Sequence, residues 1–423
     1  MKTGRRDFIA GGAAALLAGA LPPWAARAEE AAKHPLAGKP MPPWSKGRFR
    51  ITVHYTGRSE STHLVFPDST SALIDCGEFV FSSPDAVEHL PEGLSAGEAI
   101  CRRVLRDNPN GRKVDYFILS HYHSDHAGSI KCPVSVWPRT ADGSRTLCGF
   151  GRAIDMLDFG KIIDRSWPDM NDPVPRSDRF DDGVCRHVRE TYMEAERRGV
   201  KIERFLLEKG SRQISLLHGG CDRFGFTPLC ARGLVLRRDG TVLDLGTLSG
   251  KPGKGRAGFA ENPLSTGMVF SLGDFRYYTA GDFETPAFED ALAAECPAVD
   301  VAKANHHGHH TMSEKLVSAL DASVYLCGGF WHRQHMNRPT MRRIAAASKR
   351  PYLVAPGYFP DTRRKADAAE PWLARVAPEA FKPCHTVVDV APDGASYTVA
   401  MVDASVEDGA VLGAYDFKTV PKT

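Results

Sequence analysis

Histidine is concentrated in two short windows of this 423-residue chain. Seven of its 16 histidines lie within residues 121–126 and 306–310. The first window reads His-Tyr-His-Ser-Asp-His and follows the apolar run 114–120, which predicts a buried strand. Where the chain leaves the sheet, His121 and His123 can reach one metal ion, and Asp125 with His126 can reach a second. Imidazole together with carboxylate suits zinc, iron or manganese better than calcium or magnesium. The alternative is a solvated polar loop.

Other short segments extend this pattern. The chain contains Leu-Ile-Asp-Cys-Gly at 73–77, Gly-Asp at 281–282 after a predicted strand, and Asn-His-His-Gly-His at 305–309. Together with the first window they resemble the metallo-β-lactamase superfamily. Asn-Pro-Leu-Ser at 262–265 and the second histidine window are similar to one branch of it, which holds the hydrolase domain of DNA-uptake competence proteins and bacterial phosphorylcholine esterases.

The resemblance implies an α/β fold, a four-layer αββα sandwich with two metal ions at one edge of its sheets. It assigns His121 and His123 to the first ion, and Asp125 and His126 to the second. Asp282 takes the place of the aspartate that bridges the two ions. The remaining implied ligands are His306 or His307 for the second ion, with His307 favoured, and His218 for the first, with an ordinary loop histidine as the alternative.

The implied activity is that of a metal-dependent hydrolase with two divalent ions, Zn²⁺ being favoured over Mn²⁺ or Fe²⁺. Two cations about 3.5–4 Å apart can share a hydroxide and stabilise developing charge. Asp125 and Asp282 would then orient the nucleophile, so they are the predicted catalytic residues. The expected substrate is a phosphoester, with a phosphodiester favoured. A β-lactam or lactone is the first alternative, and a non-catalytic periplasmic metal-binding protein is the second.

Two segments depart from the branch pattern where substrate would be held. The Gly-His-Pro expected late in the domain is replaced by a stretch in which Arg338 precedes Pro339, and His332 or His335 could substitute for it. The early Gly-rich turn is replaced by residues 56–60, Thr-Gly-Arg-Ser-Glu. Both changes affect the inference about substrate and leave the predicted metal ligands intact.

The N-terminus predicts an export signal. Residues 1–28 combine Arg5-Arg6, an apolar stretch from Phe8 and a small-residue site at 26–28. The pattern resembles a bacterial twin-arginine signal, so the export machinery is an expected partner and the mature chain is expected to be periplasmic or secreted. The apolar stretch is shorter than the roughly 20 residues that a membrane span needs, so no stable membrane anchor is expected.

The charge balance bears on partners. The chain has 54 Lys and Arg against 51 Asp and Glu, and residues 1–28 hold all of the excess. A mature chain with no net charge lacks the general attraction to phosphates of basic nucleic-acid-binding proteins, so nucleic acid is not an expected partner. The ten cysteines form no Cys-x-x-Cys pair, which excludes a zinc ribbon or thioredoxin-type motif.

We predict three segments in the chain. Residues 1–28 are removed, residues 29–47 form a flexible lead-in rich in Pro and Gly, and residues 48–423 form a single domain. Within that domain, residues 131–212 show the weakest pattern and are predicted to be an insertion that shapes a pocket rim. Further predictions include strands at 49–55, 63–66 and 72–75, and helices at 95–107 and 313–320.

Overall fold

The computed structural model describes residues 29–79, 90–131, 138–170, 182–248, 260–328 and 336–421. The predicted export signal at residues 1–28, together with His332 and His335, lies outside these described residues. Among the helices that are described, none has the length and apolar character needed to cross a membrane.

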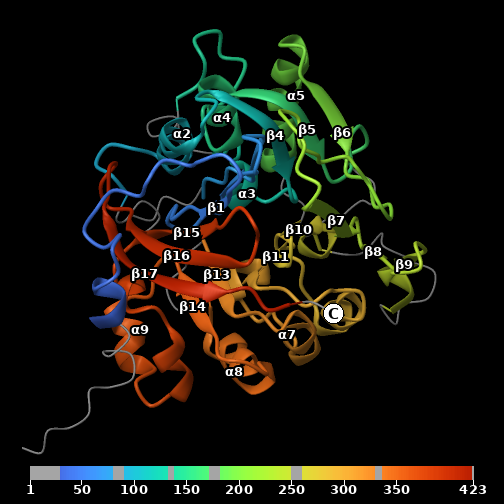
Figure 1. Ribbon diagram of the computed structural model, residues 1–423. Coiled ribbons are helices and arrows are strands. Elements are labelled where there is room, and N and C mark those ends of the chain that lie inside the picture. Colours follow the sequence, from blue (N-terminus) through green and yellow to red (C-terminus); the bar gives the residue numbers. More distant parts are fainter. Residues whose placement is uncertain are drawn as a thin grey trace, which may run out of the picture.

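Two mixed sheets form the centre of the molecule (Figure 1). In the described part of the chain the larger sheet has nine strands, in the order β17 (Val411–Lys418), β16 (Ser396–Asp403), β15 (Cys384–Val390), β1 (Phe49–Val53), β2 (Thr62–Val65), β3 (Ser71–Ile74), β4 (Lys113–Leu119), β5 (Asp158–Asp164) and β6 (Lys201–Arg204). The smaller has the order β14 (Leu353–Pro356), β13 (Val324–Cys327), β12 (Val301–Lys303), β11 (Phe275–Thr279), β10 (Gly267–Leu272), β7 (Phe224–Ala231), β8 (Leu234–Leu236) and β9 (Val242–Asp244).

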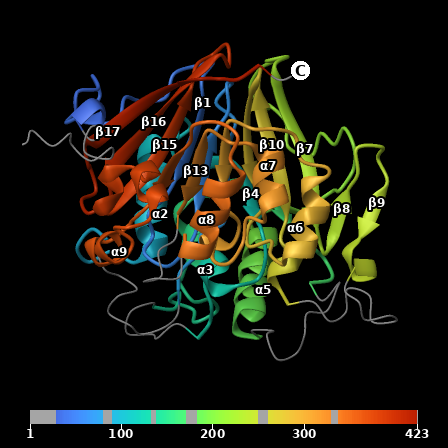
Figure 2. The ribbon, with the colours of Figure 1, turned by 90° about the horizontal axis from the view of Figure 1, so that it is seen from below.

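Helices cover the outer face of each sheet. Figure 1 shows α2 (Ala96–Asp107), α4 (Phe150–Met156) and α5 (Asp182–Arg197) beyond the larger sheet. Figure 2 shows α6 (Pro286–Ala293), α7 (Glu314–Leu320) and α8 (Arg338–Ala347) over the smaller one. The expected α/β fold with an αββα sandwich is therefore confirmed.

Two apolar cores hold the layers together, and β4 contributes to both. Tyr116 and Ile118 join the core between the sheets, whereas Phe117 and Leu119 join the core under α2, α4 and α5. Successive side chains of a strand point to opposite faces, so a strand buried on both sides reads as a continuous apolar run. This burial explains why the second half of β4, Tyr116 to Leu119, is a continuous apolar and aromatic run.

The helix starts expected from the sequence occur where capping residues lie. The Ser95 side chain accepts the backbone N–H of Glu98, and α2 begins at the next residue, Ala96. Ser313 caps α7 in the same way, through the N–H of Leu316. These bonds satisfy N–H groups that the first turn of a helix leaves without partners.

Residues 138–170 and 182–212 differ from the predicted insertion. β5 pairs in parallel with β4, and β6 pairs in parallel with β5, so this part of the chain extends the larger sheet. Phe159 and Ile162 enter the same core as Phe117. The described segment is thus integral to the sandwich. Charged residues interrupt β5, and β6 has only four residues, so neither strand shows a clear period of two in the sequence.

The lead-in at 29–47 is docked on the sheet rather than free. The N–H of Gly38 donates to the carbonyl of Val411 at 2.8 Å, and the N–H of Val411 donates to the carbonyl of Lys39 at 2.8 Å. Leu36 and Met41 pack on the adjoining apolar cluster. A Pro- and Gly-rich segment can therefore be fixed when an edge strand supplies its backbone partners.

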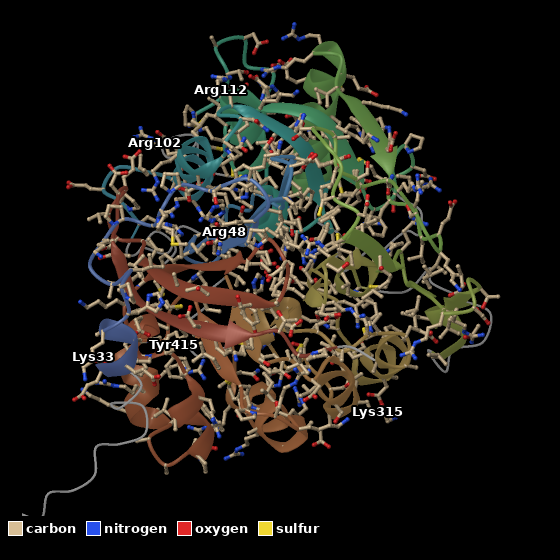
Figure 3. All side chains as sticks on the ribbon, viewed as in Figure 1. Lys33, Arg48, Arg102, Arg112, Lys315 and Tyr415 are labelled. Carbon is tan, nitrogen blue, oxygen red and sulfur yellow. The ribbon has the colours of Figure 1, made fainter. Side chains whose placement is uncertain are left out.

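Many charged side chains lie on the periphery. Lys33, Arg112 and Lys315 point outward in Figure 3, with side-chain exposures of 79%, 56% and 73%. The polar groups inside the molecule are therefore the ones that need a specific explanation.

Candidate metal centre

The candidate centre forms where loops from the two sheets meet. His121 and His123 follow β4, and α3 (Ser124–Ala127) carries the rest of the first window. Asp282 follows β11, and η4 (Asn305–Gly308), with both adjacent histidines, follows β12. Because β11 and β12 are parallel, their carboxyl ends lie at the same edge of the smaller sheet.

Two glycines allow the close approach of these loops. A Cβ atom at Gly77 would lie 1.6 Å from the carbonyl oxygen of Asp125. Gly281 has a φ of 52°, and a Cβ there would lie 3.0 Å from that of Ser120. His306 and His307 themselves adopt left-handed φ values of 46° and 50°, a conformation that is uncommon outside glycine and is associated with functional sites.

Asp282 lies at the middle of the cluster and is 1% exposed. Its Oδ1 atom is 3.1 Å from His126 Nε2. Its Oδ2 atom lies 3.5 Å from His307 Nε2, 3.7 Å from His306 Nε2 and 3.9 Å from His121 Nε2. Four imidazole rings therefore surround one buried carboxylate.

Asp282 also belongs to two groups of side chains that could each hold a metal ion. One group is His121, His123 and Asp282, and the other is Glu60, His126, Asp282 and His307. Within each group the ligand atoms lie within 4.8 Å of one another. Asp125 adjoins the second group, with Oδ2 3.4 Å from His307 Nε2.

Three of the histidines have a carboxylate on the far side of the ring. Nδ1 of His126 is 2.8 Å from Asp75 Oδ2, and Nδ1 of His307 is 2.9 Å from Glu60 Oε2. His306 has the same arrangement, with Nδ1 2.9 Å from Glu284 Oε2. A carboxylate that accepts the Nδ1 proton leaves the Nε2 lone pair available to a metal ion.

Glu60 is itself held by a buried cation. Its Oε1 atom lies 2.5 Å from Lys303 Nζ, and the two side chains are 3% and 1% exposed. The Glu60 backbone N–H also donates to the carbonyl of Asp125 at 2.8 Å. Burial alone would raise the pKa of Glu60, but Lys303 and His307 outweigh it and lower this pKa to about 2.

The other buried groups of the cluster also shift one another's pKa. Burial lowers the pKa of His121 well below its usual value, and the nearby His126 adds to this shift. Burial also lowers the pKa of His126, but Asp282 and Asp75 outweigh it and raise this pKa well above the usual value. In return, His126 and His307 overcome the burial of Asp282 and hold its pKa well below the ordinary range.

Several buried polar atoms of the cluster have no hydrogen-bond partner. Among the described residues these include both carboxylate oxygens of Asp282 and Nε2 of His126, whose 3.1 Å approach to Asp282 lacks hydrogen-bond geometry. Buried polar groups are normally satisfied, and groups that are not call for an explanation such as an ion. The donor set, imidazole plus carboxylate, fits Zn²⁺, Mn²⁺ or Fe²⁺.

The structure brings together seven of the eight residues predicted from the sequence: His121, His123, Asp125, His126, Asp282, His306 and His307. His218 lies elsewhere. Its Nε2 atom is 3.2 Å from both carboxylate oxygens of Asp115, near the start of β4, whereas His121 follows the end of that strand. In the chain His218 lies between β6 and β7, and its contact with Asp115 places it at the opposite end of β4 from the cluster. His218 is therefore not in a position to complete the first metal site.

Three side chains of the cluster were not predicted. Glu60 lies in the turn that departs from the branch pattern, Lys303 lies in β12 two residues before Asn305, and Glu284 follows Asp282 by two residues. Glu284 and Lys303 are close to predicted ligands in the sequence, which could have drawn attention to them, whereas Glu60 is far from any predicted ligand. Only the fold reveals that Glu60 faces His307, that Glu284 faces His306, and that Lys303 faces Glu60.

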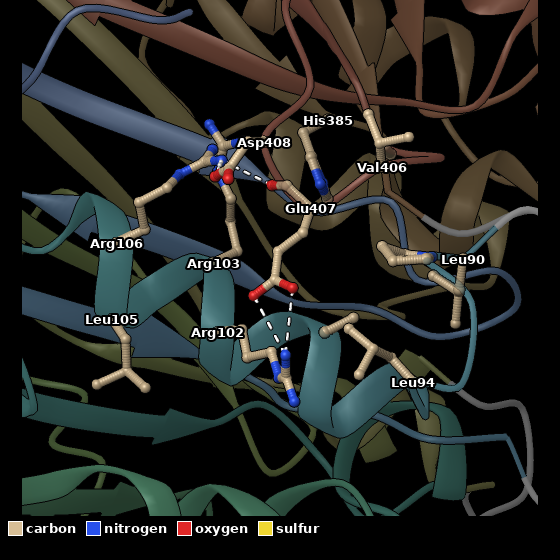
Figure 4. Close-up of a pocket in the computed structure, with 13 residues that line it drawn as sticks. Leu90, Leu94, Arg102, Arg103, Leu105, Arg106, His385, Val406, Glu407 and Asp408 are labelled. Carbon is tan, nitrogen blue, oxygen red and sulfur yellow. Dashed lines mark hydrogen bonds and ion pairs between the residues drawn. The ribbon is translucent and has the colours of Figure 1, made fainter.

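A separate pocket lies between α2 and residues 404–408 (Figure 4), with a volume of about 350 Å³. Arg102 pairs with Glu407 across it at 3.2 Å, and Arg106 pairs with Asp408 at 3.0 Å. The two arginines are thus paired within the pocket. None of its lining residues belongs to the two metal-ligand groups.

Comparison with known proteins adds little to this picture. No protein-family model and no curated protein matches the chain. One similar solved structure is a protein from Parabacteroides distasonis ATCC 8503, provisionally named a metal-dependent hydrolase. The two share 13% identity with a TM-score of 0.30, and the match covers 72% of this chain and 93% of the other. Since that likeness is too low to bear on function, the side chains of the cluster have to carry the inference.

Proposed function

We propose that this chain is an exported metal-dependent hydrolase of the metallo-β-lactamase superfamily that uses two divalent ions. The observation that carries the proposal is the place of Asp282 in both potential metal-ligand groups. One buried carboxylate with imidazoles on several sides can bridge two cations. The αββα layers and the histidine window after β4 are the context that the resemblance leads us to expect.

The residues of the cluster would have different roles in binding the cations and in orienting water. His121 and His123 would hold one cation, and His126 and His307 the other, with Asp282 between them. Two divalent cations held there would lower the pKa of water and stabilise negative charge on the reacting group. Asp125, beside His307, can accept a hydrogen bond from the attacking water and orient it. His306 is 22% exposed and faces Asp282, so it lies at the solvent side of the cluster.

We favour a phosphoester substrate, and a phosphodiester in particular, because the second histidine window resembles the branch that contains such hydrolases. With no net charge on the mature chain, attraction of an anionic substrate would come from the cations and not from the protein surface as a whole. The hydrolysis of a β-lactam or lactone is the competing activity, and a metal-binding protein without activity is the competing class.

One experiment separates these possibilities. The Zn²⁺- or Mn²⁺-loaded protein is assayed with bis-(p-nitrophenyl) phosphate and with a chromogenic cephalosporin, with Asp125→Ala as the control. We expect turnover of the phosphodiester that depends on Asp125. Turnover of the cephalosporin alone would reverse our preference, and retention of metal without either activity would favour the non-catalytic class.

Export is a separate part of the proposal. The double variant Arg5→Lys with Arg6→Lys should remain in the cytoplasm, because the twin-arginine export machinery recognises that arginine pair. Cell fractionation of the variant and the unaltered chain tests this. Equal periplasmic amounts of the two would contradict the proposed route.

A further inference from the structure

Tyr122, between the two histidines of the first metal-ligand group, is anchored at both ends. Its backbone N–H donates to Glu261 Oε1 at 2.9 Å, and its hydroxyl donates to Asp164 Oδ1 at 2.7 Å. The side chain is 2% exposed and joins the core under α4 and α5. The residue between His121 and His123 is therefore fixed through its backbone and its side chain.

Glu261 is held in turn by a fully buried arginine. Arg165 Nε lies 2.7 Å from Glu261 Oε1, and Nη2 lies 2.9 Å from Oε2, so the pair is bidentate. The guanidinium carbon lies 4.1 Å from the centre of the Tyr122 ring, within the range of a cation–π contact. Such a pair fixes geometry more firmly than a single hydrogen bond does.

The segment that follows Glu261 contacts both histidine windows. Asn262, next to Glu261, has Nδ2 3.4 Å from His306 Nε2. The Thr266 N–H donates to the carbonyl of Ser120, just before His121, at 3.1 Å. Asp164 is the last residue of β5, and Arg165 follows it. The segment after β4 therefore supplies the side chains that hold Tyr122 and Glu261.

We propose that Tyr122, Glu261 and Arg165 form a clamp that sets the spacing of His121 and His123 and thereby the affinity of their group for its cation. This inference rests on the proposed function. The three are positioning residues. Tyr122 lies within the histidine loop, Glu261 accepts its backbone N–H, and Arg165 holds Glu261. None of the three belongs to either metal-ligand group.

Tyr192 provides a matched control. Its hydroxyl donates to the other oxygen of Asp164 at 2.6 Å, and it is as deeply buried as Tyr122. Tyr122→Phe and Tyr192→Phe each remove one hydroxyl that donates a hydrogen bond to the Asp164 carboxylate. Only Tyr122 belongs to the histidine loop.

The test is a titration of the metal-free full chain with Zn²⁺ in competition with a chromophoric chelator, which resolves two binding steps. Tyr122→Phe should weaken one step by about 10-fold or more and leave the other unchanged, as is typical when a group that orients a metal ligand is lost. Tyr192→Phe should leave both steps unchanged. Thermal unfolding of the zinc-free proteins reports whether each variant folds.

Each outcome decides a different point. A wild-type chain that binds fewer than two Zn²⁺ ions would overturn the dinuclear proposal. If the wild type binds two Zn²⁺ ions but Tyr122→Phe and Tyr192→Phe weaken Zn²⁺ binding equally, the clamp is overturned and the dinuclear proposal stands. The same holds if neither variant weakens Zn²⁺ binding. If Tyr122→Phe fails to fold, Arg165→Lys decides, because Lys keeps the charge beside Glu261 but cannot form the bidentate pair.

Discussion

The carboxylate of Glu60 lies 2.9 Å from Nδ1 of His307, on the side of the ring opposite Asp282. Glu60 thereby directs Nε2 of His307 towards the centre of the cluster. Its other oxygen lies 2.5 Å from Lys303, so the orientation of a predicted ligand depends on a buried ion pair.

Glu60→Gln should weaken the second metal site by about 10- to 100-fold, the usual effect of losing a group that orients a metal ligand. It also leaves Lys303 buried without its counter-charge, which is strongly destabilising. The double variant Glu60→Gln with Lys303→Met removes both charges. We expect it to recover stability but not Zn²⁺ affinity, as measured by thermal unfolding and chelator competition. Recovery of both would mean that Glu60 acts only in folding.

Asp282→Asn should impair both metal sites at once, since Asp282 is the residue common to the two groups. We expect at least about a 100-fold loss of affinity, because even the groups that orient metal ligands contribute about 10- to 100-fold. Metal content by elemental analysis after dialysis checks this. Loss of a single equivalent would show that Asp282 does not bridge.

His306 and His307 should behave differently on substitution. His307 is 1% exposed and lies near both Asp125 and Asp282, whereas His306 is 22% exposed. His307→Ala should lose one equivalent of metal. His306→Ala should retain both equivalents and lose activity. The reverse pattern in metal analysis would assign His306 as the ligand.

The parts of the fold that the sequence predicts well are those with a strong local pattern. Ser95 begins a helix because its side chain caps the first turn, and the run before His121 is apolar because β4 is buried on both faces. β5 and β6 lack such a pattern, since both are partly exposed and carry charged residues, and β6 has only four residues. Their place in the sheet depends on parallel pairing with β4, which is a tertiary property.

The residues of the site also differ in how far the sequence alone identifies them. Ligands in dense windows, such as His121 to His126, are visible from spacing alone. Glu60 and Lys303 are distant in the sequence and acquire a role only when β12 and the 56–60 turn meet. His218 follows an apolar stretch like the other candidates, yet the chain carries it to Asp115 at the other end of β4.

His218→Ala should therefore leave the metal content unchanged. The change removes the contact with Asp115 and should lower stability modestly, by about 1 kcal/mol for a lost hydrogen bond. Zn²⁺ titration and thermal unfolding of this variant check both points. A lost equivalent of metal would place His218 back at the first site.

Acid should destabilise the folded chain through a buried histidine that is outside the metal-ligand groups. His63 is 1% exposed, and its Nε2 atom has no hydrogen-bond partner among the described residues. Burial lowers the pKa of His63 from 6.5 to about 4; Asp107 opposes this shift and Arg50 adds to it.

The unfolded chain binds a proton at His63 below about pH 6.5, whereas the folded chain binds it only below about pH 4. Unfolding therefore takes up a proton between these values, and stability falls as the pH falls. The shift corresponds to a maximum of about 3 kcal/mol for this residue. His63→Gln should flatten the dependence of the unfolding free energy on pH in this window and run parallel to the wild type above pH 7. Denaturant unfolding of the metal-free proteins at a series of pH values measures this, and identical slopes below pH 6 would rule out a contribution from His63.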